Sequence, residues 1–141
     1  MTKHIAIGAL CYLIPTFALG FVWHLVAFKG YYEQLAIYRQ DVIIPFGLLS
    51  MSIQAVLFAW IYVRVFAPLP ETTSRVFGYA AFGAVLSWSF TTVAVAAKNV
   101  MSSVPDYLLI ESGYTVLQWL MVGPLTVLLL RRSELLRAAH A

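Results

Sequence analysis

The chain has 141 residues, of which 62% are hydrophobic and only 11% are charged, with a formal net charge of +3. A soluble domain carries about a quarter charged residues, so these charges are too few to cover a surface exposed to water. The composition excludes an ordinary soluble protein and indicates an integral membrane protein with the lipid bilayer as its main partner. The positive charge does not indicate nucleic-acid binding, because membrane topology accounts for it.

Charge-free stretches divide the chain into membrane-length segments. Residues 5–28, 43–63 and 76–97 contain no Asp, Glu, Lys or Arg, and residues 107–130 contain only Glu111. A membrane-spanning helix needs about 20 apolar residues. The pattern predicts an all-α fold in which residues 1–141 form a single transmembrane domain, a four-helix bundle with helices at about 5–28, 43–66, 75–97 and 107–130.

The first apolar stretch is longer than the ~7–15-residue core of a secretory signal peptide, and no A-x-A cleavage site follows it. We therefore expect a retained first helix. The loop after it, residues 29–42, carries balanced charges and three tyrosines. It is expected to be either a short interfacial helix or a solvated loop.

Basic residues are distributed unevenly between the two sides of the predicted bundle. One side holds both termini and the turn 67–75, and it contains Lys3, Arg64, Arg75, Arg131, Arg132 and Arg137. The other side contains Lys29, Arg39 and Lys98. Because cytoplasmic loops carry an excess of Lys and Arg, the distribution predicts a multi-pass protein with cytoplasmic N- and C-termini.

Two ionisable residues lie inside predicted membrane helices at matching depths. His24 is four residues inside the outer end of the first helix, and Glu111 is four residues inside the start of the fourth. With a helical rise of about 1.5 Å per residue, both lie roughly 6 Å below the outer boundary. Such residues are costly in a membrane and often mark function. We expect His24 and Glu111 to meet, with Lys98 as a third candidate member of the site.

Polar residues continue below Glu111 on one face of the fourth helix, at Tyr114, Thr115 and Gln118. The second helix carries Gln54 at a comparable depth. These positions predict a polar pocket that opens to the outer face, has a floor of Gln54, Gln118, Trp88 and Trp119, and binds its ligand through His24, Glu111, Lys98, Tyr114, Gln118 and Gln54.

A structural interpretation of the same residues stays open. Polar side chains in membrane bundles commonly join helices through hydrogen bonds worth ~0.6 kcal/mol each. His24, beside Trp23, is also compatible with a simple interfacial residue. Gln54 and Gln118 favour the structural interpretation more than the ionisable residues do.

Metal and cofactor sites are poorly supported by the sequence. His4 and His140 are predicted on the cytoplasmic side, across the membrane from His24, so a bis-histidine haem within one chain and a three-ligand zinc site both lack ligands. The spacing Gly20-x-x-x-His24 is similar to the A-x-x-x-H pigment-binding pattern of light-harvesting helices. We predict no metal, and the sequence does not decide between a pigment, a haem, a quinone or no cofactor.

Catalytic chemistry is also poorly supported. Ser50 and Ser112 are available as nucleophiles, but no second acid or histidine completes a catalytic arrangement. The single cysteine, Cys11, excludes the membrane thiol oxidoreductases, which need a pair. The sequence therefore favours a non-enzymatic protein.

Three segments together resemble a known group of proteins: "WHLVAFKGYYEQLAIYR", "IIPFGLLSMSIQAVLFAWIY" and "AAKNVMSSVPDYLLIESGYTVLQWLMVG". They resemble an uncharacterised family of small bacterial four-helix inner-membrane proteins, a domain of unknown function, over most of residues 20–123. The most recognisable part runs from Lys98 through "VMSSVPDYLLIES", which includes Glu111. The resemblance implies a bacterial inner (cytoplasmic) membrane, but no activity or cofactor.

Three functions are compatible with these features. The first is a non-enzymatic membrane protein whose outer-leaflet pocket at His24 and Glu111 binds a small or lipidic ligand. The second is an accessory or assembly subunit of a larger membrane complex, or a homodimer. The small size of the chain favours this second function. A small-residue surface on the third helix, formed by Gly78, Ala81, Gly83 and Ala84, favours it as well. The third is a small proton-coupled transporter that uses Glu111.

Overall fold

The computed structural model describes residues 2–39 and 41–138, and the ordered elements in this part of the chain are helices. Three membrane-length helices include a π-helical turn: α1 (Thr2–Val22) continues into η1 (Trp23–Ala27), α3 (Ile44–Ile61) into η2 (Tyr62–Phe66), and α4 (Thr72–Trp88) into η3 (Ser89–Val93) and α5 (Ala94–Ala96). A short α2 (Lys29–Leu35) follows η1, and α6 (Val104–Ala138) is the longest element.

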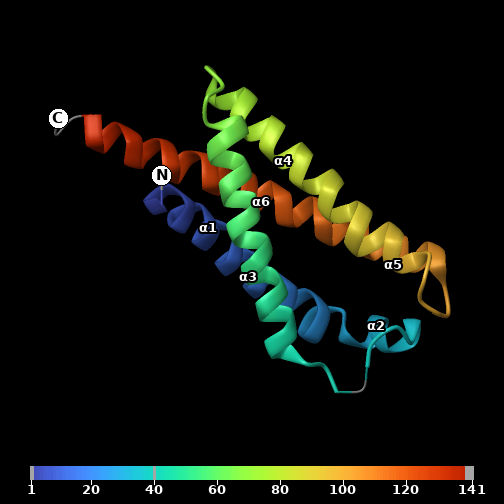
Figure 1. Cartoon of the computed structure of the whole chain (residues 1–141). Coiled ribbons are helices and arrows are strands. Elements are labelled where there is room, and N and C mark those ends of the chain that lie inside the picture. The colour runs from blue at the N-terminus through green and yellow to red at the C-terminus, as the bar shows by residue number, and fades with distance from the viewer. Residues whose placement is uncertain (1, 40, 139–141) are drawn as a thin grey trace.

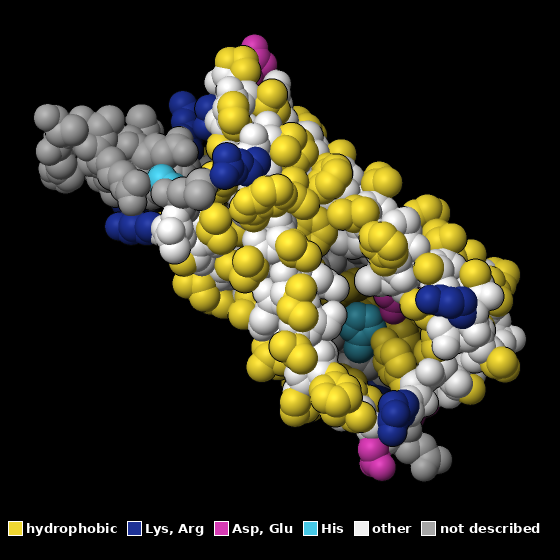
Figure 2. All heavy atoms as spheres, viewed as in Figure 1, with side chains coloured by type: hydrophobic (Ala, Val, Ile, Leu, Met, Phe, Trp, Pro, Cys, Tyr) yellow, Lys and Arg dark blue, Asp and Glu magenta, His cyan; other side chains and the backbone are white. Residues whose placement is uncertain are grey.

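Four helical units in the described chain are long and apolar enough to cross a membrane, namely Thr2–Ala27, Ile44–Phe66, Thr72–Ala96 and Val104–Arg132. All predicted helix boundaries lie within three residues of these spans. The all-α fold with four helices of membrane length is therefore confirmed. Figure 2 shows a face covered largely by hydrophobic side chains, with charged groups gathered toward the two ends.

The helices pack in an open arrangement around α1 and α6. α1 contacts both α3 and α6, and α6 also contacts α4, so the predicted contact between the first and fourth membrane helices is present. Figure 1 shows the start of α1, the α3–α4 turn and the C-terminal part of α6 at one end, with α2 and the α5–α6 loop at the other. At the first of these ends Arg131 of α6 donates a hydrogen bond to the Thr72 hydroxyl at the start of α4.

Aromatic rings form the core of the bundle. The Trp119 ring makes edge contacts with Phe58 and Tyr79, at centroid distances of 4.8 and 5.4 Å. Its indole N–H donates to the Ser87 hydroxyl over 3.1 Å. Gly83 lies directly against this ring, since a Cβ added there would be 2.1 Å from the ring carbon Cη2. Part of the predicted small-residue surface is therefore the α4–α6 contact.

A second, smaller cluster lies at the other end and holds α2. Tyr32 and Leu35 of α2 pack against Tyr107 and Ile110 of α6. The α5–α6 loop adds two hydrogen bonds, from Ser102 N–H to the Leu35 carbonyl (3.1 Å) and from the Ser102 hydroxyl to the preceding carbonyl (2.8 Å). A short helix, one of the two alternatives for this loop, is thus present and is docked onto the bundle.

The first half of α3 diverges from the other helices. Every residue from 41 to 50 is exposed, including Phe46 with 69% of its surface accessible. Burial on α3 begins only at Ala55, where the helix reaches the aromatic core. The two halves of α3 therefore have different surroundings, and a space remains beside the first half.

We expect Gly83→Ala to lower the free energy of unfolding by about 1–3 kcal/mol, the usual cost of overpacking a core. The added Cβ would overlap the Trp119 ring, which is 1% exposed and packed in the aromatic core. The matched control is Gly30→Ala, because no atom lies within 4 Å of its added Cβ. Unfolding in mixed micelles measures both variants, and a Gly83→Ala protein as stable as the parent would contradict the close α4–α6 packing.

Candidate functional site

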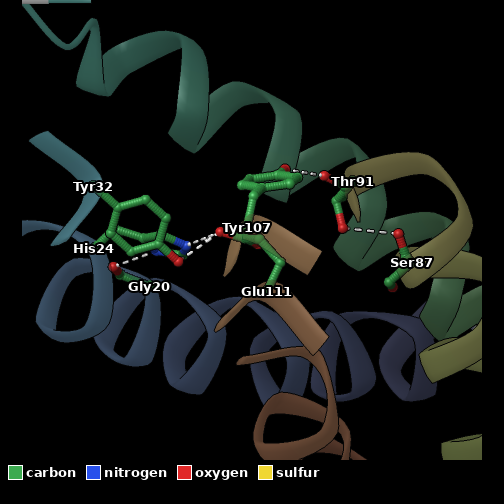
Figure 3. Close-up of polar contacts among 7 residues, drawn as sticks. All are labelled: Gly20, His24, Tyr32, Ser87, Thr91, Tyr107 and Glu111. Carbon is green, nitrogen blue, oxygen red and sulfur yellow. Dashed lines mark hydrogen bonds and ion pairs between the residues drawn. The ribbon is translucent and has the colours of Figure 1, made fainter. Parts of the chain in front are cut away.

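His24 and Glu111 meet, as their matched depths predict. His24 lies in η1, and its Nε2 is 3.2 Å from Oε1 of Glu111 on α6. Both side chains are largely buried, with 17% of the His24 side chain and 7% of the Glu111 side chain exposed. π-Helical turns occur frequently at functional sites. Figure 3 shows His24, Tyr32 and Glu111 pointing toward one another from three separate elements.

Hydrogen-bond geometry limits where the protons of this pair can lie. Nδ1 of His24 is 2.9 Å from the carbonyl oxygen of Gly20, and a carbonyl only accepts, so Nδ1 carries a hydrogen. The contact between Nε2 and Glu111 Oε1 then holds one proton, either on the imidazole or on the carboxyl group. The first form is a cation beside an anion, and the second is two neutral groups. The pair is electrically neutral in both.

Tyr32 completes the coordination of Glu111. Its hydroxyl donates to the same Oε1 over 2.6 Å, a length typical of a hydroxyl that donates to a carboxylate. This favours the form with the proton on His24. The Tyr32 side chain is 1% exposed, and burial, reinforced by Glu111, raises the pKa of its hydroxyl well above the ordinary value. Tyr32 therefore keeps its proton and remains a donor.

Three tyrosine rings surround His24. Its centroid lies 4.6 Å from Tyr114 in an edge contact, 4.9 Å from Tyr32 and 6.1 Å from Tyr38. Tyr38 stacks on Tyr32 at 4.9 Å with an interplanar angle of 12°. Gly20 makes room for this arrangement, since a Cβ there would be 3.2 Å from the Tyr114 hydroxyl. His24 is therefore confined on several sides.

A cavity of about 230 Å³ lies beside His24, between α1 and the diverging half of α3. Figure 2 shows this face hollowed beside the first half of α3. Two lining residues carry polar side chains, His24 and Tyr38, and the remaining lining residues are Phe17, Gly20, Phe21, Leu25, Val42, Ile44, Gly47, Leu48 and Met51. The cavity is thus apolar with a polar edge, in contrast to the predicted polar pocket.

The predicted floor of this pocket is part of the helix packing. Gln118 Nε2 donates to the Tyr12 hydroxyl at 3.3 Å and to the Thr16 hydroxyl at 3.1 Å. The Tyr12 hydroxyl donates to Gln54 Oε1 at 2.8 Å, and Gln54 Nε2 donates to Ser50 at 3.3 Å. These amides bond to other side chains because α1 lies directly between α3 and α6, so they join three helices and do not line the cavity.

Other predicted members of the site also lie outside the cavity. Lys98 is exposed in the turn beyond α5, and no ion pair joins it to Glu111 in the described part of the chain. Trp88 donates to the Ser112 hydroxyl over 2.9 Å, and Trp119 belongs to the aromatic core. Glu111 and Tyr114 of α6 contact His24 but are not among the residues that line the cavity.

Sequence reasoning missed the roles of Tyr32, Tyr38 and Gly20. Tyr32 and Tyr38 belong to the loop 29–42, which was expected at the outer surface and contains three tyrosines. The helical periodicity of the membrane segments does not extend into this loop, so it does not show which tyrosine faces Glu111. The left-handed conformation of Ala36 (φ 55°) ends α2 between Tyr32 and Tyr38 and sets their relative positions. The available signal was that the carboxylate of Glu111, if buried, needs hydrogen-bond donors. This signal does not identify the tyrosine that donates to it.

No cluster of three or more His, Cys, Asp or Glu side chains is placed to hold a metal ion among the described side chains, residues 2–39 and 41–132. His140, for which a cytoplasmic position is predicted, lies outside the described residues. Comparisons of the chain with models of protein families, with curated proteins and with solved structures found no match. The functional argument therefore depends on the geometry of the site.

We expect Tyr32→Phe to lower the free energy of unfolding by about 1.5–3 kcal/mol, the usual worth of a hydrogen bond to a charged group. Tyr31→Phe is the matched control, because Tyr31 is exposed and adjacent in sequence. Chemical unfolding in mixed micelles near pH 7 compares the two variants with the parent. Equal losses in both would show that the Tyr32 hydroxyl does not stabilise the fold.

The stabilising effect of Tyr32 should depend on pH with a defined sign. An unfolded tyrosine ionises near pH 10, whereas the raised pKa keeps Tyr32 protonated in the folded protein. Above about pH 10 the parent must bind a proton on folding, which costs about 1.4 kcal/mol per pH unit. The advantage of the parent over Tyr32→Phe should be constant below about pH 9 and shrink above pH 10. A constant difference measured up to pH 11.5 would contradict the burial of this hydroxyl.

Proposed function

We propose that this protein is a non-enzymatic membrane protein that binds a small or lipidic molecule in the cavity beside His24. The observation that supports this most directly is the position of the His24–Glu111 pair at the edge of an apolar cavity between α1 and α3. Ionisable groups at membrane depth are expensive and usually serve a purpose. Concave apolar sites with a few fixed polar groups are typical of ligand binding.

We further propose that the cavity opens in the outer leaflet of a bacterial inner membrane, with both termini in the cytoplasm. The excess of Lys and Arg at the end that holds the start of α1 and the α3–α4 turn supports this orientation. The bacterial location is proposed from the sequence resemblance of most of residues 20–123 to small bacterial four-helix membrane proteins. In this orientation α2 faces the outside and lies over the candidate site.

Ligand binding accounts for the geometry better than proton-coupled transport through Glu111. A transporter needs polar groups that continue toward the opposite side of the membrane. Beyond Gln118 the buried positions of α6 include Val122, Val127 and Leu130, which belong to the aromatic core, and one polar residue, Thr126. None of these is a carboxylate or a histidine that could pass a proton onward from Glu111, as expected of a site with access from one side.

The binding proposal predicts that a specific molecule is retained when the protein is extracted into lipid nanodiscs. Gly47→Leu should reduce that molecule at least tenfold, because position 47 lines the cavity and has open space for a side chain. Gly30→Leu is the matched control, since position 30 also has open space but lies outside the cavity lining. Mass spectrometry of extracted small molecules measures this. No species enriched over the bulk lipid in the parent protein would overturn the proposal.

One observation favours the second candidate, an accessory or assembly subunit. Residues 44–50, the first two turns of α3, are all exposed, so a helix of another protein or of a second copy has room to pack there. Cross-linking in native membranes through a photoreactive residue at position 46 distinguishes the cases. A discrete protein adduct would support the subunit function, and adducts with lipid alone would argue against it.

A further inference from the structure

We propose that the ligand of this cavity is an uncharged amphiphile with a single apolar chain. Its hydrogen-bonding head meets the Tyr38 hydroxyl, and its chain lies between α1 and α3. This inference depends on the proposed function, because it assumes that the cavity binds a molecule. It follows from the charge balance of the site, from the walls of the cavity and from the position of Tyr38.

The absence of charged residues from the cavity lining disfavours a charged head. The residues that line the cavity include no Lys, Arg, Asp or Glu, and the His24–Glu111 pair beside it is neutral in both of its protonation forms. Arg39 and Asp41, which follow Tyr38 in the loop, are exposed and are not among the lining residues. An anionic or cationic head in the cavity would therefore remain unpaired in apolar surroundings, which is strongly unfavourable.

The cavity walls match an apolar chain. α1 and η1 contribute Phe17, Phe21 and Leu25, and α3 contributes Ile44, Leu48 and Met51. All six lie within the membrane-length spans, so the cavity opens at the depth of the hydrocarbon layer and a chain can reach it from the bilayer. Its volume of about 230 Å³ is below the ~300–1,000 Å³ of common ligand pockets. This size suits part of one chain and not the paired chains of a phospholipid.

Tyr38 is the polar group that remains for the head. The described part of the chain offers its hydroxyl no hydrogen-bond partner, whereas both ring nitrogens of His24 are already used. Its ring stacks on Tyr32, which in turn donates to Glu111. Tyr38 is thus held at the edge of the cavity and can exchange a hydrogen bond with an alcohol, ester or carbonyl head.

The test uses the full chain in nanodiscs and a dodecanol analogue with a photoreactive diazirine on its chain. Three competitors share the same chain length and differ in the head: dodecanol, dodecyltrimethylammonium and dodecanesulfonate, each at equal mole fraction in the lipid. We expect photoadducts on peptides that cover residues 17–25 and 44–51. Dodecanol should displace the probe at least tenfold better than either charged competitor.

Matched variants locate the chain and the head separately. Gly47→Leu should abolish the saturable photoadducts, and Gly30→Leu should preserve them. Tyr38→Phe, which removes only the hydroxyl, should weaken competition by dodecanol about fivefold, the usual effect of one neutral hydrogen bond. Tyr31→Phe, an exposed tyrosine outside the cavity lining, should leave it unchanged.

The outcomes separate this inference from the proposed function. If the charged competitors displace the probe as well as dodecanol does, binding stands and the uncharged head is wrong. If Tyr38→Phe and Tyr31→Phe behave alike, the assignment of the head to Tyr38 is wrong. If the parent protein gives no saturable adducts, or if Gly47→Leu leaves them intact, both the inference and the binding site are overturned.

Discussion

The carboxyl group of Glu111 determines how the α2 end of the molecule is assembled. A carboxyl group buried among apolar side chains is costly unless a cation and hydrogen-bond donors satisfy it. Here one oxygen is approached by His24 from η1 and by Tyr32 from α2. A helix of seven residues is not stable in isolation, so α2 depends on these tertiary contacts. The same carboxyl group thus joins α6 to η1 and α2, the last two elements before α3 in the chain.

The cavity is a consequence of where these donors come from. Because η1 and α2 supply both partners of Glu111, α3 contributes none, and nothing polar draws its first half toward the pair. α3 is held instead by Ala55 and the aromatic core farther along, and by the Tyr12–Gln54 hydrogen bond. The space left between the first half of α3 and α1 is the cavity. The His24–Glu111 pair therefore lies next to an apolar cavity, and of the two residues only His24 lines it.

The sequence was sufficient for the membrane helices and for the His24–Glu111 contact, because both depend on distance along a helix. A fixed rise per residue converts sequence position into depth, and two side chains at one depth on adjacent helices can meet. The direction in which each side chain points was harder to predict. The residue type of Gln118 does not say whether it faces a cavity or Tyr12, and after Phe28 leaves the helical conformation (φ −114°, ψ 18°) no periodicity connects Tyr32 to the membrane helices.

The His24–Glu111 pair and Tyr38 differ in how their polar atoms are used. Both nitrogens of His24 are occupied, one by Gly20 and one by Glu111, so the pair can bond to a ligand only by giving up a bond that holds the site together. Tyr38 differs, because its hydroxyl makes no hydrogen bond within the described part of the chain. Its ring is held by stacking on Tyr32. Loss of the pair would therefore release α2, whose Tyr32 ring positions Tyr38, while α3 would stay held by the aromatic core. A change at Tyr38 would leave these contacts of Glu111 in place and alter only the polar edge of the cavity.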